Sequence, residues 1–192
     1  MVPHDHTETE QKIMKKQEPR LILFTDVGDT IIDEGTEVRD KDGVVIHAHC
    51  IPGARETYLA LHAAGYSIVM VADGLVTSFA NTMRENGLED IFAARVISEA
   101  IGEEKPSRKM FDAAMKALGL DDGDKGRILM IGNNIARDIA GANRYGIRSV
   151  LLTWSPRRPF DPSSPDEVPT YRIAEPGELI PLLERLEGER RA

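Results

Sequence analysis

The chain has 192 residues, 41% of them hydrophobic, which suits one globular domain and leaves no room for a second full domain. Because 24 Lys and Arg face 32 Asp and Glu, the net charge of -8 argues against nucleic acid as a partner. The single cysteine, Cys50, excludes an internal disulfide and a zinc site made of several cysteines. Without a long apolar stretch or signal-peptide pattern, the chain is expected to be cytoplasmic and to have no membrane partner.

The order of elements along the chain predicts an α/β fold. Residues 1–19 are polar and predict a flexible N-terminal arm, followed by a core domain over residues 20–153. Apolar runs that predict strands lie at Leu21–Asp26, Ser67–Ala72, Ala93–Ile97, Ile128–Ile131 and Ser149–Leu152. Helical patterns lie between them at 53–64, 107–118 and 135–145. Strands that alternate with helices predict a parallel sheet.

The last forty residues have a different character. Prolines recur between residues 156 and 169, and this spacing predicts an irregular arm. Residues 170–173 then predict an edge strand, and a terminal helix is expected from about Glu175 to Leu186. Residues 154–192 are therefore expected to form an arm, a strand and a helix that pack on the core.

Four polar segments follow the predicted strands. In order, they contain Asp26 with Thr30, Ala72 with Asp73, Lys105 before a proline, and Asn133 with Asp138. Because open α/β sheets bind ligands at the carboxyl ends of their strands, we expect these segments to form one site. Taken singly, Asp26 is better explained as a turn-forming acid and Lys105 as a surface lysine, so the evidence for a site lies in their common register.

This order of segments resembles the haloacid-dehalogenase superfamily, over residues 20–153. Members carry an aspartate nucleophile in an Asp-x-Asp-x-Thr motif, a Ser or Thr after the second strand, a Lys, and a Gly-Asp-x-x-x-x-Asp motif. The resemblance implies a Rossmann-like, doubly wound sheet with strand order about 3-2-1-4-5. It also implies Mg²⁺-dependent phosphomonoester hydrolysis through an aspartyl-phosphate.

The chemistry assigns roles to the matching residues. Asp26 is the expected nucleophile, and Lys105 is the second expected catalytic residue because its ammonium holds both phosphate and nucleophile. A carboxylate and a phosphate repel each other, so a bridging Mg²⁺ is expected. Its expected ligands are Asp26, the backbone carbonyl of Gly28, the amide oxygen of Asn133, and Asp138.

The positions expected to bind the phosphorylated substrate are Thr30, Ala72 and Asp73. Thr30 and the backbone amides after residue 26 are expected to fix the turn and bind oxygen atoms. Ala72 and Asp73 follow the second strand, although Asp73 and Gly74 together are also a common turn signal.

Three residues depart from the superfamily pattern. Gly28 stands where phosphatases of this superfamily have the acid that protonates the leaving oxygen, and such help is worth about 10²–10⁴-fold. Ala72 lacks the usual hydroxyl, and Asn133 lacks one charge of the metal site. Asp29 is adjacent to Gly28, but its side chain is expected to point elsewhere. These departures predict weak phosphatase activity, a changed reaction, or none.

The segment between Thr30 and Pro52 is too short for a helical cap. Residues 41–43 predict a turn between strands at 35–39 and 44–49, so we expect a flap over a capless site. An open site favours a bulky phosphorylated substrate, or closure by another subunit of a homo-oligomer or by the Pro-rich arm.

Three functions therefore stay open. The first is a Mg²⁺-dependent phosphatase, and the second is a catalytically impaired relative that binds a phosphorylated ligand or partner protein. The third is a metal-independent dehalogenase, which needs no proton donor at Gly28 but does need an enclosed, dry pocket. Turnover of phosphate esters with and without Mg²⁺ separates the first two.

Overall fold

The computed structural model describes residues 20–191, so the predicted arm at 1–19 lies outside the described residues. Within them, six parallel strands form one sheet in the order β5-β4-β1-β6-β7-β8. The strands are β1 (Ile22–Thr25), β4 (Ser67–Ala72), β5 (Phe92–Ile97), β6 (Ile128–Gly132), β7 (Arg148–Leu152) and β8 (Tyr171–Ile173). The expected order 3-2-1-4-5 is confirmed, and β8 extends the sheet beyond β7.

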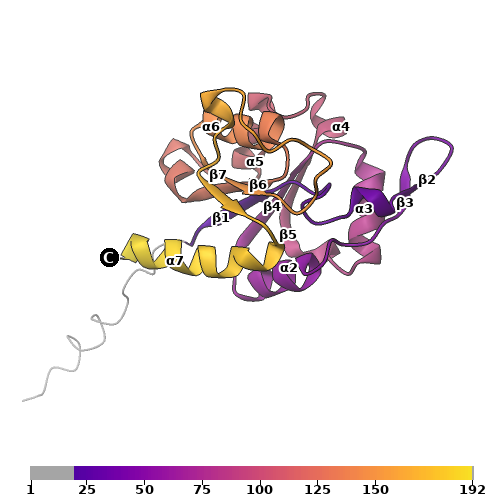
Figure 1. The fold of residues 1–192 in the computed structure, drawn as a ribbon, viewed down its shortest axis with the longest axis horizontal. Helices are drawn as coiled ribbons and strands as arrows, with labels where there is room; N and C mark the ends of the chain where they lie inside the picture. The colour runs from indigo at the N-terminus through magenta and orange to yellow at the C-terminus, as the bar shows by residue number, and fades with distance from the viewer. Residues whose placement is uncertain (1–19, 192) are drawn as a thin grey trace, which may run out of the picture.

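Helices cover both faces of the sheet (Figure 1). Buried residues of α2 (Ala54–Ala63), α3 (Val76–Glu85) and α7 (Leu179–Arg191) pack on one face, and those of α5 (Arg108–Ala117) and α6 (Ala140–Tyr145) pack on the other. Side chains alternate across the sheet, so that Leu23 faces the first group while Ile22 and Phe24 face the second. The short helices are α4 (Ser98–Ile101), η1 (Glu34–Thr36), η2 (Glu89–Ile91), η3 (Asp122–Arg127), η4 (Ile135–Ile139), η5 (Pro165–Glu167) and η6 (Pro176–Glu178).

Some helices differ from the expectation. The helix expected at 135–145 begins as a single π-helical turn, η4, and continues as α6. Helix α3 was not predicted, because its buried face mixes the polar residues Ser78 and Thr82 with apolar ones. Helix α7 continues to Arg191 rather than ending near Leu186. No helix within residues 20–191 is long and apolar enough to cross a membrane.

The flap is a short hairpin that is fastened to α3. Strands β2 (Val38–Arg39) and β3 (Val45–His47) pair in antiparallel fashion, and the segment at 31–51 contains no α-helix. The amide of Val45 donates to Ser78 Oγ at 2.9 Å, and Asn81 Nδ2 donates to the Val45 carbonyl at 3.0 Å. The polar residues on the inner face of α3 therefore position the flap beside the sheet.

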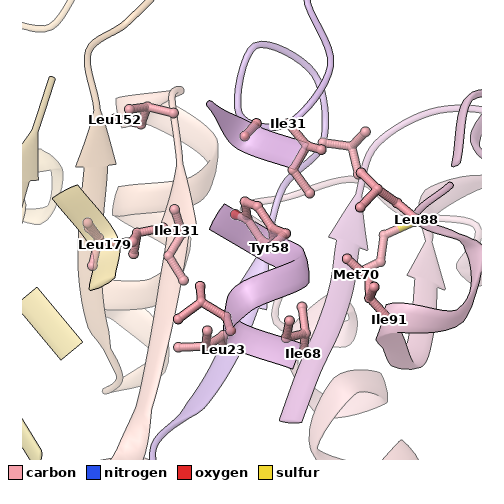
Figure 2. Close-up of a cluster of buried hydrophobic side chains, with 14 of the residues drawn as sticks. Leu23, Ile31, Tyr58, Ile68, Met70, Leu88, Ile91, Ile131, Leu152 and Leu179 are labelled. Carbon is pink, nitrogen blue, oxygen red and sulfur yellow. The ribbon is translucent and has the colours of Figure 1, made fainter. Parts of the chain in front are cut away.

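A buried tyrosine links α2 to the end of the central strand. Tyr58 lies in the main apolar cluster, among side chains of the central strands (Figure 2), and is 1% exposed. Its hydroxyl lies 2.6 Å from Thr25 Oγ1, and Thr25 Oγ1 donates to the Asp26 carbonyl at 2.8 Å. Because the single hydroxyl proton of Thr25 is engaged with Asp26, Tyr58 is the donor of the first bond.

This pair predicts a graded loss of stability. Tyr58→Phe removes one hydrogen bond and leaves Thr25 bonded, so the free energy of unfolding is expected to fall by about 1 kcal/mol. Thr25→Val removes the acceptor and leaves the buried Tyr58 hydroxyl unpaired, which is expected to cost about 1–3 kcal/mol. Urea unfolding of both variants measures the difference; a larger loss for Tyr58→Phe than for Thr25→Val contradicts the assigned donor.

Candidate active site

A tight turn after β1 presents Asp26. The Val27 carbonyl accepts the amides of Thr30, Ile31 and Ile32 at 3.2, 2.8 and 2.9 Å. Asp29 adopts a positive φ of 49°, which Asp tolerates better than most residues, and this conformation lets the chain reverse immediately. The Asp26 side chain is thereby held at the carboxyl end of the central strand and lines a pocket.

Lys105 joins the two carboxylates of the site. Its Nζ lies 2.7 Å from Asp26 Oδ1 and 2.7 Å from Asp138 Oδ1. The Lys105 and Asp138 side chains are each 1% exposed, whereas that of Asp26 is 15% exposed. Burial disfavours the charged lysine, but the Asp138 and Asp26 carboxylates outweigh it and keep the pKa of Lys105 above its usual value. One cation thus faces two carboxylates.

Asp138 reaches this cluster because of the π-helical turn and a glycine. Its Oδ2 accepts the Asn134 amide at 3.0 Å, and Asn134 caps η4 through the amides of Ala136 and Arg137. A Cβ at Gly132 would lie 2.2 Å from Asp138 Oδ2, so only glycine leaves room for this carboxylate. Burial raises the pKa of Asp138 to about 6, while the charge of Lys105 opposes that rise.

Asp73 connects the loops around the cluster. Its Oδ1 accepts the Lys105 amide at 3.0 Å, and its Oδ2 accepts Arg137 Nη1 at 3.2 Å. Asp73 also lines the pocket, whereas Ala72 is fully buried in the core and does not. The contacts of Asp73 are those of a residue that positions Lys105.

Two expected site residues carry polar atoms without partners. The Thr30 hydroxyl and the Asn133 amide nitrogen are buried, and neither has a hydrogen-bond partner among the described residues. Asn133 lines the pocket, but Thr30 does not. A buried amide nitrogen without a partner, on the wall of a pocket, is suited to donate a hydrogen bond to a ligand.

A network of charges between the turn and the Pro-rich arm was missed by sequence reasoning. Asp29 is fully buried, and its Oδ1 accepts Arg157 Nη1 at 2.5 Å; Arg157 Nη2 also lies 2.8 Å from Asp33 Oδ1. Arg158 Nη2 lies 3.4 Å from Glu34 Oε2. Sequence reasoning could not identify these pairs, because partners more than 120 residues away leave no local pattern.

The pocket beside Asp26 has a volume of about 150 Å³, and Lys105, Asn133 and Asp138 also line it. Charged and polar residues form one part of its wall, and Leu75 and Phe79 supply an apolar part. Glu34 lies in the same wall, and burial raises its pKa, with a further contribution from Asp29. The pocket therefore combines carboxylates, a buried cation and an apolar surface, a mixture that suits a small charged organic molecule.

The donor set is compatible with a hard cation. Among the described residues, no group of three or more His, Cys, Asp or Glu side chains is arranged to hold a metal ion. The candidate donors, all from residues that line the pocket, are the carboxylates of Asp26 and Asp138, the side-chain oxygen of Asn133 and the backbone carbonyl of Gly28. Oxygen donors of this kind suit Mg²⁺, which retains several waters and needs few protein ligands.

Comparisons with known proteins identify the family of this chain. Residues 5–146 match the model of the haloacid dehalogenase-like hydrolase family. The chain is 30% identical over 135 residues to a glyceraldehyde 3-phosphate phosphatase of Methanopyrus kandleri, covering 70% of this chain and 57% of that one. It is 30% identical over 134 residues to the pyrimidine 5'-nucleotidase YjjG of Escherichia coli, covering 69% and 56%. The chain thus spans little more than half the length of these relatives.

Solved structures share the fold. The magnesium-bound HAD-hydrolase YfnB of Bacillus subtilis has a TM-score of 0.70 at 19% identity, covering 86% of this chain and 99% of that one. A HAD phosphatase of Thermococcus onnurineus has a TM-score of 0.68 at 16% identity, covering 85% and 97%. With the strand order, the four segments and the family match together, the chain belongs to the haloacid dehalogenase-like hydrolase family.

Proposed function

We propose that this protein is a Mg²⁺-dependent phosphomonoester hydrolase with Asp26 as its nucleophile. The observation that carries the proposal is the contact of Asp26 Oδ1 with Lys105 Nζ at 2.7 Å, at the carboxyl end of the central strand and on the wall of a pocket. A carboxylate oxygen that contacts a buried cation on the wall of a pocket is placed to attack an electrophile bound there. Phosphatase names among the relatives support an ester of phosphate as the substrate.

Each residue of the site has its own role in phosphoryl transfer. Asp26 attacks phosphorus and forms an aspartyl-phosphate, which water then hydrolyses. Lys105 compensates negative charge on Asp26 and on the transferring oxygens, and its burial strengthens that interaction. Arg137 and Arg158 line the same pocket and add positive charge to its wall. Asp73 holds the Lys105 backbone and so keeps the ammonium in place.

Mg²⁺, held by Asp26, Asp138, the side-chain oxygen of Asn133 and the Gly28 carbonyl, would supply charge neutralisation between nucleophile and phosphate. Asn133 keeps an oxygen donor but lowers the negative charge of the donor set. We therefore infer weaker Mg²⁺ affinity than a third carboxylate would give. The substrate class is a phosphomonoester whose organic part contacts Leu75 and Phe79.

The first prediction concerns turnover. Purified full chain is expected to release inorganic phosphate from phosphomonoesters with Mg²⁺ present, and to lose that activity after EDTA treatment. Asp26→Asn keeps the shape of the side chain but removes the nucleophilic charge, so its rate is expected to fall to background. Absence of any difference between wild type and Asp26→Asn across a panel of esters contradicts the proposal; retained binding of those esters would then favour the binding protein.

The second prediction concerns the metal. Asp138→Ala removes a proposed ligand, so calorimetry is expected to show Mg²⁺ affinity reduced by about 10-fold or more. Asp122→Ala, which removes an exposed carboxylate far from the pocket lining, serves as the control and is expected to leave affinity unchanged. Equal Mg²⁺ affinities of wild type and Asp138→Ala would show that the metal lies elsewhere.

The third prediction concerns Gly132. Its replacement by Ala forces the Asp138 carboxylate to move, so both Mg²⁺ affinity and the free energy of unfolding are expected to fall, the latter by about 1–3 kcal/mol. Gly126→Ala, whose added methyl meets nothing within 4 Å, is the matched control and is expected to change stability by less than about 0.5 kcal/mol. Similar urea midpoints for the two variants contradict the close approach of residues 132 and 138.

A further inference from the structure

The site contains a carboxyl group in the space that Gly28 leaves open. A Cβ at Gly28 would lie 2.2 Å from Glu34 Oε1 and 3.0 Å from Glu34 Cδ. Those distances are far below van der Waals contact, so the end of the Glu34 side chain occupies the volume that a side chain at residue 28 would need. The carboxyl comes from the next turn of the chain, six residues later.

Several contacts hold Glu34 in this place. Its backbone amide donates to Asp29 Oδ1 at 3.1 Å, and its helix η1 begins with Asp33 Oδ1 accepting the Gly35 amide at 2.8 Å. Arg157 binds both of these aspartates. Arg158 Nη2 lies 3.4 Å from Glu34 Oε2, which leaves Oε1 as the oxygen that faces Gly28. The carboxyl is therefore oriented from two sides.

Glu34 shares the pocket with the nucleophile. Both Glu34 and Asp26 line it, and the Glu34 side chain is 34% exposed, so it is open to a leaving group and to water. Glu37 lines the pocket too, but its carboxylate pairs with Arg39 on the flap. Of the carboxyl groups that line the pocket, Glu34 is the one that overlaps the space above Gly28.

We propose that Glu34 is the general acid and base of the phosphatase reaction, supplied from η1 in place of a side chain at Gly28. This inference rests on the function proposed above. In the first step an Asp26 oxygen bonds to phosphorus, the ester P–O bond breaks, and the Glu34 carboxyl gives its proton to the departing alkoxide. In the second, Glu34 accepts a proton from water as that water bonds to phosphorus and the P–O bond to Asp26 breaks, which restores both carboxyl groups and releases phosphate.

The dependence on leaving group tests this role. Glu34→Gln keeps size and hydrogen bonding but cannot transfer the proton, so kcat/KM for an alkyl phosphate is expected to fall by about 10²-fold or more. For p-nitrophenyl phosphate, whose leaving group needs no proton, the fall is expected to be less than about 10-fold. Glu37→Gln is the matched control, because it neutralises a carboxylate of the same pocket wall, and it is expected to leave the ratio of the two substrates unchanged.

Substitution of Gly28 tests the role of Glu34 without replacing Glu34 itself. Gly28→Ala displaces the mobile end of the Glu34 side chain, so it is expected to lower the alkyl-to-nitrophenyl ratio as Glu34→Gln does. In a Glu34→Ala background the same change is expected to have no further effect on that ratio, because the carboxyl is already absent. The double variant Gly28→Asp with Glu34→Ala returns a carboxyl to this volume and is expected to recover part of the activity on the alkyl ester.

The outcomes separate the two proposals. An active wild type and an inactive Asp26→Asn, combined with an unchanged substrate ratio in Glu34→Gln, overturn the role of Glu34 and leave the phosphatase intact. Equal losses on both esters also overturn it, since they show a structural role only. A wild type no faster than Asp26→Asn on either ester overturns the phosphatase and the role of Glu34 together. Thermal unfolding of each variant checks that the fold is retained.

Discussion

The site depends on one buried ammonium between two carboxylates. Lys105 draws Asp26 from the end of β1 and Asp138 from η4 to within 2.7 Å of a single nitrogen. A buried charge is costly unless it is paired, so each of the three side chains is placed by the need to compensate the others. This constraint gathers three separate segments of chain at one point on the edge of the sheet.

The backbone around the cluster is arranged to satisfy that constraint. The π-helical turn exposes the Asn134 amide to Asp138, and Gly132 leaves the space that the carboxylate fills. Asp73 fixes the backbone of Lys105 from the neighbouring strand. A π-helical turn in place of a regular first turn is a local cost that is common at functional sites. Here it directs Asp138 toward the lysine instead of toward solvent.

The sequence predicted the sheet well because a buried strand is a local pattern. The five core strands and the helices α2 and α5 followed from apolar runs and from the positions of glycine and proline, whereas the strand order followed from the resemblance to the superfamily. Helix α3 was not predicted from the sequence, because some of the residues it buries are polar and bind the flap. The ion pair of Asp29 with Arg157 was not predicted either, because the two residues are 128 positions apart and periodicity carries no information at that separation.

Gly28 also shows the difference between a local sequence pattern and an arrangement in space. From the sequence, Gly28 counts as the loss of an acid, because a motif compares the residues at equal positions. The reaction instead needs a carboxyl group at a given place in the site, whichever residue supplies it. That volume is filled by Glu34 Oε1 from the following turn, and it can be filled only because residue 28 has no Cβ. Gly28 and Glu34 are therefore coupled: a larger residue at 28 excludes the carboxyl of 34, and glycine at 28 admits it. The absence of a Cβ at Gly28 therefore accounts for both observations: residue 28 departs from the motif, and the Glu34 carboxyl occupies the space beside it.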